Sequence, residues 1–209
     1  MNNSKHSKHL FLMGDIRIGK STMIKNVLKP FMNKISGFYV QRIYKENQLK
    51  GFRFCTLSEG EYKLDNHITS EICPFPLFIE QTDKDKWKIN EDVFIDSFNK
   101  AFDKEKLKEI ILMDEIGGFE FDNAYITKCV FNLLDKDKPI IGVIKSPRSK
   151  EIMDKYFPID SILMNKDRNL VKLIKHKAVE IIHVNNSNKN EIQNKIKSWV
   201  GANLNDNME

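Results

Sequence analysis

The feature that most constrains this chain is a glycine-bounded loop near the N-terminus, between an apolar run and a helical pattern. Residues 10–13 are all apolar, Gly14 and Gly19 follow with the spacing G-x-x-x-x-G-K-S, and a helical pattern begins at Ser21. A phosphate-binding (Walker A) loop requires this order of strand, loop and helix, because its glycines let backbone N–H groups turn toward phosphate oxygens. The sequence therefore predicts nucleotide binding.

The loop residues have distinct expected roles. Lys20 is expected to reach the β- and γ-phosphates, and the Ser21 hydroxyl is expected to bind Mg²⁺. The predicted nucleotide-binding residues are Gly14, Asp15, Ile16, Arg17, Ile18, Gly19, Lys20, Ser21 and Thr22. The alternative interpretation is a glycine-containing turn that only joins a strand to a helix.

Length and composition describe one ordinary globular domain. The 209 residues include 41% hydrophobic and 30% charged residues, which is enough to build a substantial core. We expect a single nucleotide-binding domain over residues 1–204, with an antiparallel meander inserted at about residues 37–64 and a frayed tail at 205–209. The polar N-terminus lacks the apolar core of a signal peptide, and no apolar run reaches the roughly 18 residues needed to cross a bilayer.

Charge and cysteine content narrow the expected surroundings. The net charge is +5, but lysines alternate with acidic residues, as at 135–138, and this pattern is typical of solvated faces rather than of a nucleic-acid surface. The three cysteines are far apart and form no C-x-x-C pair, so we expect reduced thiols. These features predict a cytoplasmic protein with no membrane contact.

Apolar runs alternate with helical patterns along most of the chain. After the first strand, further strands are predicted at residues 37–43, 51–57, 110–113, 139–144 and 178–184. Helices are predicted at residues 21–31, from a cap at Asn90, from a cap at Asp122, at 150–156, and at 190–200 with Gly201 as the stop. Residues 65–90 carry no clear pattern, and residues 81–86 are expected to form a polar loop. The alternation predicts a three-layer α/β fold of the RecA-like P-loop type, with a mainly parallel sheet beside the meander.

A second chemical signal lies about ninety residues after the loop. Four apolar residues, 110–113, end in Asp114 and Glu115, which is the form of a Walker B segment. Asp114 is expected to contact Mg²⁺ through water, and Glu115 is expected to polarise the attacking water. The alternative is a solvated pair of carboxylates at the end of a strand.

Positive charge must also meet the transferred phosphoryl group. Lys145 and Arg148 follow the predicted strand 139–144, at the sheet edge where nucleotides bind in open α/β folds. Arg17 lies inside the loop itself. Each of the three is a candidate contact for the γ-phosphate or an ordinary surface cation, and the sequence leaves this open.

Four landmarks, in this order, resemble the small P-loop nucleoside-triphosphatase family, which includes thermostable prokaryotic enzymes and a human cancer-related one. They are residues 14–22, Ile35-Ser-Gly-Phe-Tyr39, Met113-Asp-Glu-Ile-Gly-Gly-Phe-Glu120 and residues 139–144. The resemblance implies a Mg²⁺-dependent hydrolase that converts nucleoside triphosphates to diphosphates and phosphate with low base specificity. It assigns Lys20, Ser21 or Thr22, Asp114 and Glu115 the roles already argued from chemistry.

This chain departs from the family pattern at three places. The family loop is usually rich in Gly and Pro, whereas residues 15–18 are Asp-Ile-Arg-Ile here. Gly118 stands where the family often has Lys, and Val40, Gln41 and Arg42 replace a Thr and acidic residues after Gly-Phe-Tyr. These differences keep open a nucleotide-binding switch with little turnover.

Phosphoryl transfer to a small acceptor is another alternative on the same scaffold. Kinases of this type usually close an arginine-bearing lid over the phosphates, because the guanidinium group binds them with two parallel hydrogen bonds. Only Arg42 and Arg53 lie between the loop and the acidic pair. This deficit favours hydrolysis over a kinase.

Overall fold

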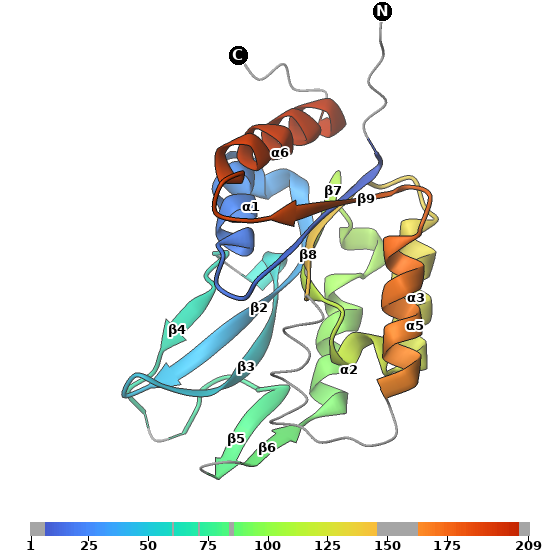
Figure 1. Cartoon of the computed structure of the whole chain (residues 1–209). Coiled ribbons are helices and arrows are strands. Elements are labelled where there is room, and N and C mark those ends of the chain that lie inside the picture. The colour runs from blue at the N-terminus through green and yellow to red at the C-terminus, as the bar shows by residue number, and fades with distance from the viewer. Residues whose placement is uncertain (1–6, 60, 71, 84–85, 146–162, 205–209) are drawn as a thin grey trace, which may run out of the picture.

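The computed structural model describes residues 7–59, 61–70, 72–83, 86–145 and 163–204 (Figure 1). The strands are β1 (His9–Gly14), β2 (Ile35–Lys45), β3 (Gln48–Thr56), β4 (Asp65–His67), β5 (Ile79–Asp83), β6 (Lys86–Ile89), β7 (Ile110–Ile116), β8 (Ile140–Ile144) and β9 (Val179–Val184). The α-helices are α1 (Lys20–Leu28), α2 (Glu91–Ala101), α3 (Ala124–Leu134), α5 (Leu163–Ile174) and α6 (Lys189–Leu204). Short 3₁₀ helices occupy Lys29–Lys34, Leu57–Glu59, Lys104–Lys106 and Phe119–Phe121.

Within these residues the strands form one mixed sheet of nine strands, in the order β6-β5-β3-β2-β7-β8-β1-β9, with β4 paired to β2 beside this path. The strands β2, β7, β8, β1 and β9 are parallel. Each of β1, β7 and β8 contains a run of consecutive apolar residues, which is typical of strands buried on both faces. This arrangement confirms the predicted α/β class.

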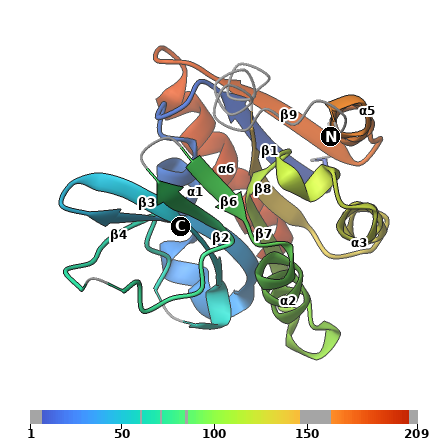
Figure 2. The same ribbon diagram turned by 90° about the horizontal axis from the view of Figure 1, so that it is seen from below.

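Helices cover both faces of the sheet and complete three layers (Figures 1 and 2). On one face α1 and α6 pack together, with Ile24, Leu28 and Trp199 fully buried or nearly so. On the other face α2, α3 and α5 enclose a second core that includes Phe98 and Val130. The loop between β1 and α1 lies at the edge of the sheet where the parallel strands end (Figure 1).

The antiparallel part of the sheet is larger than the sequence indicates. A two-residue turn joins β2 to β3 through Glu46 and Asn47, which both have positive φ, as the tight turns of twisted hairpins require. Strands β5 and β6 continue this part to Ile89, well beyond the expected range 37–64. β2 belongs to both parts, because its first residues pair with β7 in parallel and its later ones pair with β3.

Two expectations need correction, the polar loop at 81–86 and the bounds of the hairpin strands. Residues 65–67, 79–83 and 86–89 are strands, although the sequence pattern showed none there and predicted a polar loop at 81–86. They are short and stand at or near the sheet edge, so their side chains need not form an apolar run. The hairpin strands also extend further into the polar reversal than predicted.

Several helix boundaries differ from the prediction for local reasons. α1 ends at Leu28, because Pro30 lies at the start of the 3₁₀ helix that follows. Asn123, one residue after the expected Asp122, caps α3 by accepting a hydrogen bond from the Ile126 N–H at 3.1 Å. α6 continues through Gly201, since Leu204 is still buried against the core.

Two expected features lie outside the described residues. They are the short helix at 150–156 and the frayed tail at 205–209. Over the residues that the structure does describe, no helix combines the length and the apolar character needed to cross a membrane.

Candidate active site

The two glycines of the loop serve different physical needs. Gly14 ends β1 against β9, and a Cβ atom there would stand 2.5 Å from the Val184 carbonyl oxygen, so space alone excludes a side chain. At Gly19 a Cβ would meet nothing within 4 Å, but its φ of 100° is the left-handed conformation, which glycine adopts without strain. Gly19 is the N-cap of α1 and makes no side-chain cap.

The start of α1 is therefore suited to an anion. The first N–H groups of a helix have no partner within it, and here no side chain caps them. The helix dipole adds partial positive charge at the same end. Backbone amides without a side-chain cap, next to a loop with open space over Gly19, make a site for phosphate oxygens.

Lys20 folds back over the loop. Its Nζ donates hydrogen bonds to the carbonyl oxygens of Gly14 and Asp15 at 2.8 and 2.7 Å. Burial lowers the pKa of Lys20, against the opposing effects of Glu115, Asp114 and Asp15. The ammonium group is thus held among the loop carbonyls with two carboxylates of β7 close enough to act on it.

Asp114 is the centre of the site. It lies fully buried on β7, and its Oδ1 accepts a hydrogen bond from the Ser21 hydroxyl at 2.8 Å. Its Oδ2 accepts a hydrogen bond from the Tyr62 hydroxyl at 2.5 Å. Between the two hydroxyl residues at the start of α1, Ser21 points to Asp114 while Thr22 is exposed.

Burial raises the pKa of Asp114 to about 6, and Glu115 adds to the rise, while the hydrogen bonds from Tyr62 and Ser21 oppose it. A carboxylate buried among neutral hydroxyl donors suits a hard divalent cation, whose charge would compensate for the lost water. Within the described chain no cluster of three or more His, Cys, Asp or Glu side chains could hold a metal by itself. Ser21 and Asp114 could instead hold Mg²⁺ together with phosphates and water, as this ion prefers.

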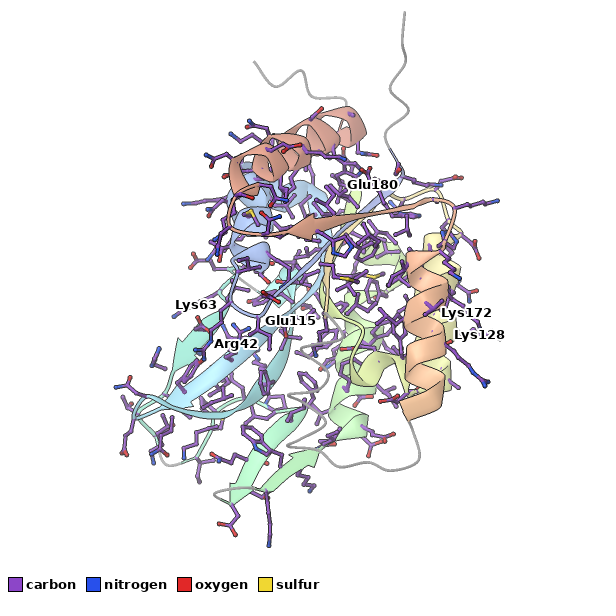
Figure 3. All side chains as sticks on the ribbon, viewed as in Figure 1. Arg42, Lys63, Glu115, Lys128, Lys172 and Glu180 are labelled. Carbon is purple, nitrogen blue, oxygen red and sulfur yellow. The ribbon has the colours of Figure 1, made fainter. Side chains whose placement is uncertain are left out.

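Glu115 follows Asp114 with a strained backbone and a fixed partner. Its φ is 71°, a conformation that costs a non-glycine residue roughly 1–3 kcal/mol and that surrounding contacts must maintain. Its Oε1 accepts a hydrogen bond from Arg42 Nη2 at 3.2 Å, and Arg42 Nη1 lies 3.5 Å from Asp65 Oδ1. Figure 3 shows Arg42 and Glu115 beside each other near the loop.

The three candidate cations have different positions. Lys145 follows β8, and its Nζ lies 2.8 Å from the point where a Cβ on Gly118 would stand, so it covers the turn after β7. Arg17 is exposed in the loop and has a φ of 63°. Arg148 lies outside the described residues.

The structure thus brings Lys20, Ser21, Asp114 and Glu115 to one place, as their spacing predicts. Asp15, Ile16 and Arg17 are exposed, whereas Ile18 packs against the core.

Two site residues were missed as partners of the acidic pair. Tyr62 lies alone in a polar stretch and gives no sequence signal. Arg42 could have been noticed as one of only five arginines, at a place where the family pattern has acidic residues.

Comparisons with known proteins identify relatives of this chain. The model of the NTPase family matches residues 9–197. The nucleoside-triphosphatase THEP1 of Thermotoga sp. (strain RQ2) is 24% identical over 193 residues, covering 90% of this chain and 93% of that protein. The protein of the same name from Methanocaldococcus jannaschii is 24% identical over 152 residues, which is 70% of this chain and 83% of the relative.

Solved structures show the same fold. A human cancer-related nucleoside triphosphatase superposes with a TM-score of 0.58 at 20% identity, over 93% of this chain and 97% of the other. THEP1 from Aquifex aeolicus superposes with a TM-score of 0.54 at 19% identity, over 91% and 97%. With a family match that spans most of its length, the chain belongs to the NTPase family.

Proposed function

We propose that this chain is a Mg²⁺-dependent nucleoside-triphosphatase that converts nucleoside triphosphates to diphosphates and phosphate. One observation carries the proposal: the Ser21 hydroxyl at the start of α1 lies 2.8 Å from the buried carboxylate of Asp114, and Glu115 follows it. Family membership and the names of the relatives support hydrolysis as the reaction.

Phosphate binding is assigned to residues 14–22. Backbone N–H groups at the start of α1 would surround the phosphate oxygens, and Lys20 would exchange its carbonyl partners for the β- and γ-phosphates. Ser21 and Asp114 would hold Mg²⁺, which when bound supplies positive charge against the phosphates. Lys145, Arg148 and Arg17 remain candidates for additional charge at the γ-phosphate.

Glu115 is assigned the role of activating the attacking water. In the proposed step the water oxygen bonds to the γ-phosphorus, and the bond from that phosphorus to the bridging oxygen breaks. Glu115 takes a proton from the water as it attacks. The nucleoside diphosphate leaves with the bridging oxygen, and phosphate is released.

Low base specificity is part of the same proposal. The groups gathered at the site are backbone amides, a lysine, a hydroxyl and carboxylates, and they recognise a triphosphate and a divalent cation. All nucleoside triphosphates share those features. Similar turnover of ATP, GTP, CTP and UTP is therefore expected.

The test is phosphate release by purified protein from each of these four nucleotides, with Mg²⁺ and with EDTA. Release should require the metal, should be lost in Lys20→Ala, and should fall strongly in Glu115→Gln. Lys29→Ala is a matched control, because Lys29 is an exposed lysine that follows the same helix. Release that neither Lys20→Ala nor Glu115→Gln changes would rule out the proposal.

The same assay separates the alternatives. A kinase would form ADP faster when a small acceptor is added, with no matching release of phosphate. A nucleotide-binding switch would bind ATP tightly without measurable turnover. Either result would replace hydrolysis as the assigned function.

A further inference from the structure

Residues 61–67, here called the brace segment, are fastened along β2. The Tyr39 hydroxyl donates to the Glu61 carbonyl oxygen at 2.8 Å, and Gln41 Nε2 donates to the Lys63 carbonyl oxygen at 2.6 Å. The Arg42 N–H donates to the Leu64 carbonyl oxygen at 2.8 Å. β4, the end of the segment, then pairs with β2 in parallel. Backbone position along this segment is therefore set by β2.

The first contact from the brace segment to the acidic pair is through Tyr62. Its side chain is buried, its ring lies against Tyr39 with centroids 4.7 Å apart, and its hydroxyl donates to Asp114 Oδ2. With Ser21 on Oδ1 and Tyr62 on Oδ2, each oxygen of Asp114 accepts a hydrogen bond from a different hydroxyl.

The second contact is through Asp65 and Arg42. The guanidinium of Arg42 lies between two carboxylates, with Nη1 at 3.5 Å from Asp65 and Nη2 at 3.2 Å from Glu115. Burial alone would lower the pKa of Arg42, but the two carboxylates raise it above its usual value. Because Asp65 also contacts the guanidinium group, Arg42 is held in place and fixes the orientation of the strained Glu115 more firmly than it would alone.

We propose that the brace segment positions both carboxylates of the acidic pair, Asp114 through Tyr62 and Glu115 through Asp65 and Arg42. This inference rests on the proposed function for the roles of the two carboxylates. Tyr62 and Arg42 are positioning residues, because each acts through a carboxylate. The segment therefore connects β2 to the proposed metal site through Tyr62 and to the proposed water site through Asp65.

The Tyr62 contact and the Arg42 contact predict different defects, one in metal binding and one in catalysis. Tyr62→Phe should weaken Mn²⁺ binding to the ADP-bound protein by about tenfold, as removal of a partner behind a metal ligand usually does. Arg42→Gln should leave Mn²⁺ affinity within about twofold but lower kcat by about tenfold or more, with KM changed little, because it misplaces a group needed in the chemical step. Mn²⁺ binding is measured by electron paramagnetic resonance, and kcat and KM by phosphate release.

Matched controls separate positioning from general damage. Tyr125→Phe removes a hydroxyl that is hydrogen-bonded to Asn99 on the outer helices, and Arg168→Gln removes an exposed arginine from α5. Both should leave Mn²⁺ affinity, kcat and KM at wild-type values. Asp65→Asn is an exposed change suited to the case in which Arg42→Gln does not fold. As a single substitution, Asp65→Asn should lower kcat by about threefold. Added to Arg42→Gln it should lower kcat no further, because both substitutions break the same series of contacts from Asp65 through Arg42 to Glu115.

The outcomes are distinct. Wild-type Mn²⁺ affinity in Tyr62→Phe, or wild-type kcat in both Arg42→Gln and Asp65→Asn, would overturn the brace. If the wild-type protein binds Mn²⁺ and ADP but hydrolyses no nucleotide, the proposed function fails. The role of the brace segment is then tested by measurements that need no hydrolysis. The Mn²⁺ measurement then tests the contact from Tyr62 to Asp114. A double-mutant cycle of urea midpoints for Arg42→Gln and Glu115→Gln tests the contact from Arg42 to Glu115. Additive effects in that cycle would contradict the Arg42 contact.

Discussion

The parallel and antiparallel parts of the sheet contribute differently to one site. The parallel strands β1 and β7 carry the loop and the acidic pair, which are the groups proposed to meet phosphate, metal and water. Tyr62, just before β4, contacts Asp114. Arg42 on β2 contacts Glu115, and Asp65 on β4 contacts Arg42 in turn. The groups proposed to bind lie on or next to parallel strands in the middle of the sheet, whereas the residues proposed to position them lie on β2 and on the segment fastened along it.

This difference indicates which parts of the molecule hold the site side chains in position. Strands covered on both faces can shift little, because protein interiors are close-packed. The acidic pair lies just where β7 leaves its regular pairing with β8, between Met113 and Ile116. Its side chains therefore need support from outside the parallel part, and β2 brings that support because it belongs to both.

The largest expected effect sets the two parts against each other in catalysis. Glu115→Gln should lower kcat for phosphate release by about 100-fold to 1000-fold, because it removes the proposed general base from the parallel part. Arg42→Gln, in the antiparallel part, is expected to lower kcat less, because a displaced Glu115 can still take up a proton in a fraction of its conformations. Steady-state assays on both variants check the ranking. A larger loss in Arg42→Gln than in Glu115→Gln would reverse the proposed division of roles.

A pair of glycine substitutions tests the same contrast in stability. In Gly142→Ala, on central β8, the new Cβ would stand 2.2 Å from the Met113 carbonyl oxygen and 2.8 Å from the Phe11 ring. In Gly51→Ala, on β3, the Cβ would stand 2.5 Å from the Ile79 carbonyl oxygen, on β5 near the sheet edge. We expect the free energy of unfolding to fall by about 3 kcal/mol for Gly142→Ala and by about 1 kcal/mol for Gly51→Ala, because β5, next to the edge strand β6, can move away more easily than a central strand. Urea denaturation followed by tryptophan fluorescence measures both, and equal losses would contradict the assumed difference in rigidity.

The parallel part could be read from the sequence because its signals are local. Residues 110–113 and 140–144 are unbroken apolar runs, and the loop is a fixed spacing around Gly19 and Lys20. Strands buried on both faces leave such runs, and phosphate binding demands particular residues at particular places. Ser21 meets Asp114 because the loop after β1 and the end of β7 lie at the same edge of the sheet.

In the antiparallel part the hairpin of β2 and β3 was predicted, but the contacts from this side of the sheet to the acidic pair were not, because their signals are not local. Tyr62 stands between Glu61 and Lys63 with no periodic pattern, and its burial depends on hydrogen bonds that β2 makes to the backbone. Arg42 stands in a strand pattern, where nothing shows that its side chain turns to β7. Such placements depend on register and tertiary contact, which residue types do not encode on their own.

A buried histidine makes the stability of the parallel part depend on pH. His9 on β1 is fully buried, with Nε2 2.8 Å from the Leu134 carbonyl oxygen and Nδ1 accepting from the Ile140 N–H at 3.2 Å. These contacts suit the neutral ring. Burial lowers the pKa of His9 from 6.5 to about 4. As pH falls below the unfolded pKa of 6.5, the unfolded chain takes up the proton first, so stability is lost progressively down to about pH 4.

The expected loss from this residue is about 3 kcal/mol between pH 7 and pH 4. It is measured as the difference in unfolding free energy between the wild type and His9→Asn, followed by urea denaturation across that range. At pH 7 the wild type should be more stable, because His9 satisfies two backbone groups. The difference should shrink or reverse toward pH 4. A difference that is independent of pH would show that His9 does not impose the neutral form on the fold.

The smallest expected effect compares the helix caps over the two parts. Asn123 caps α3, whose first turn has no acidic residue, at an Oδ1 to N distance of 3.1 Å. Asn90 caps α2 at 3.4 Å, and Glu91 and Asp92 follow it in the first turn. Asn123→Ala should therefore cost about 1 kcal/mol and Asn90→Ala about 0.5 kcal/mol, because the acidic side chains of α2 still favour its N-terminus when the cap is lost. Thermal unfolding measures both. Asn123→Ser keeps a cap and should recover most of the loss at α3, whereas a Ser variant no more stable than Asn123→Ala would show that the residue stabilises α3 by some means other than capping.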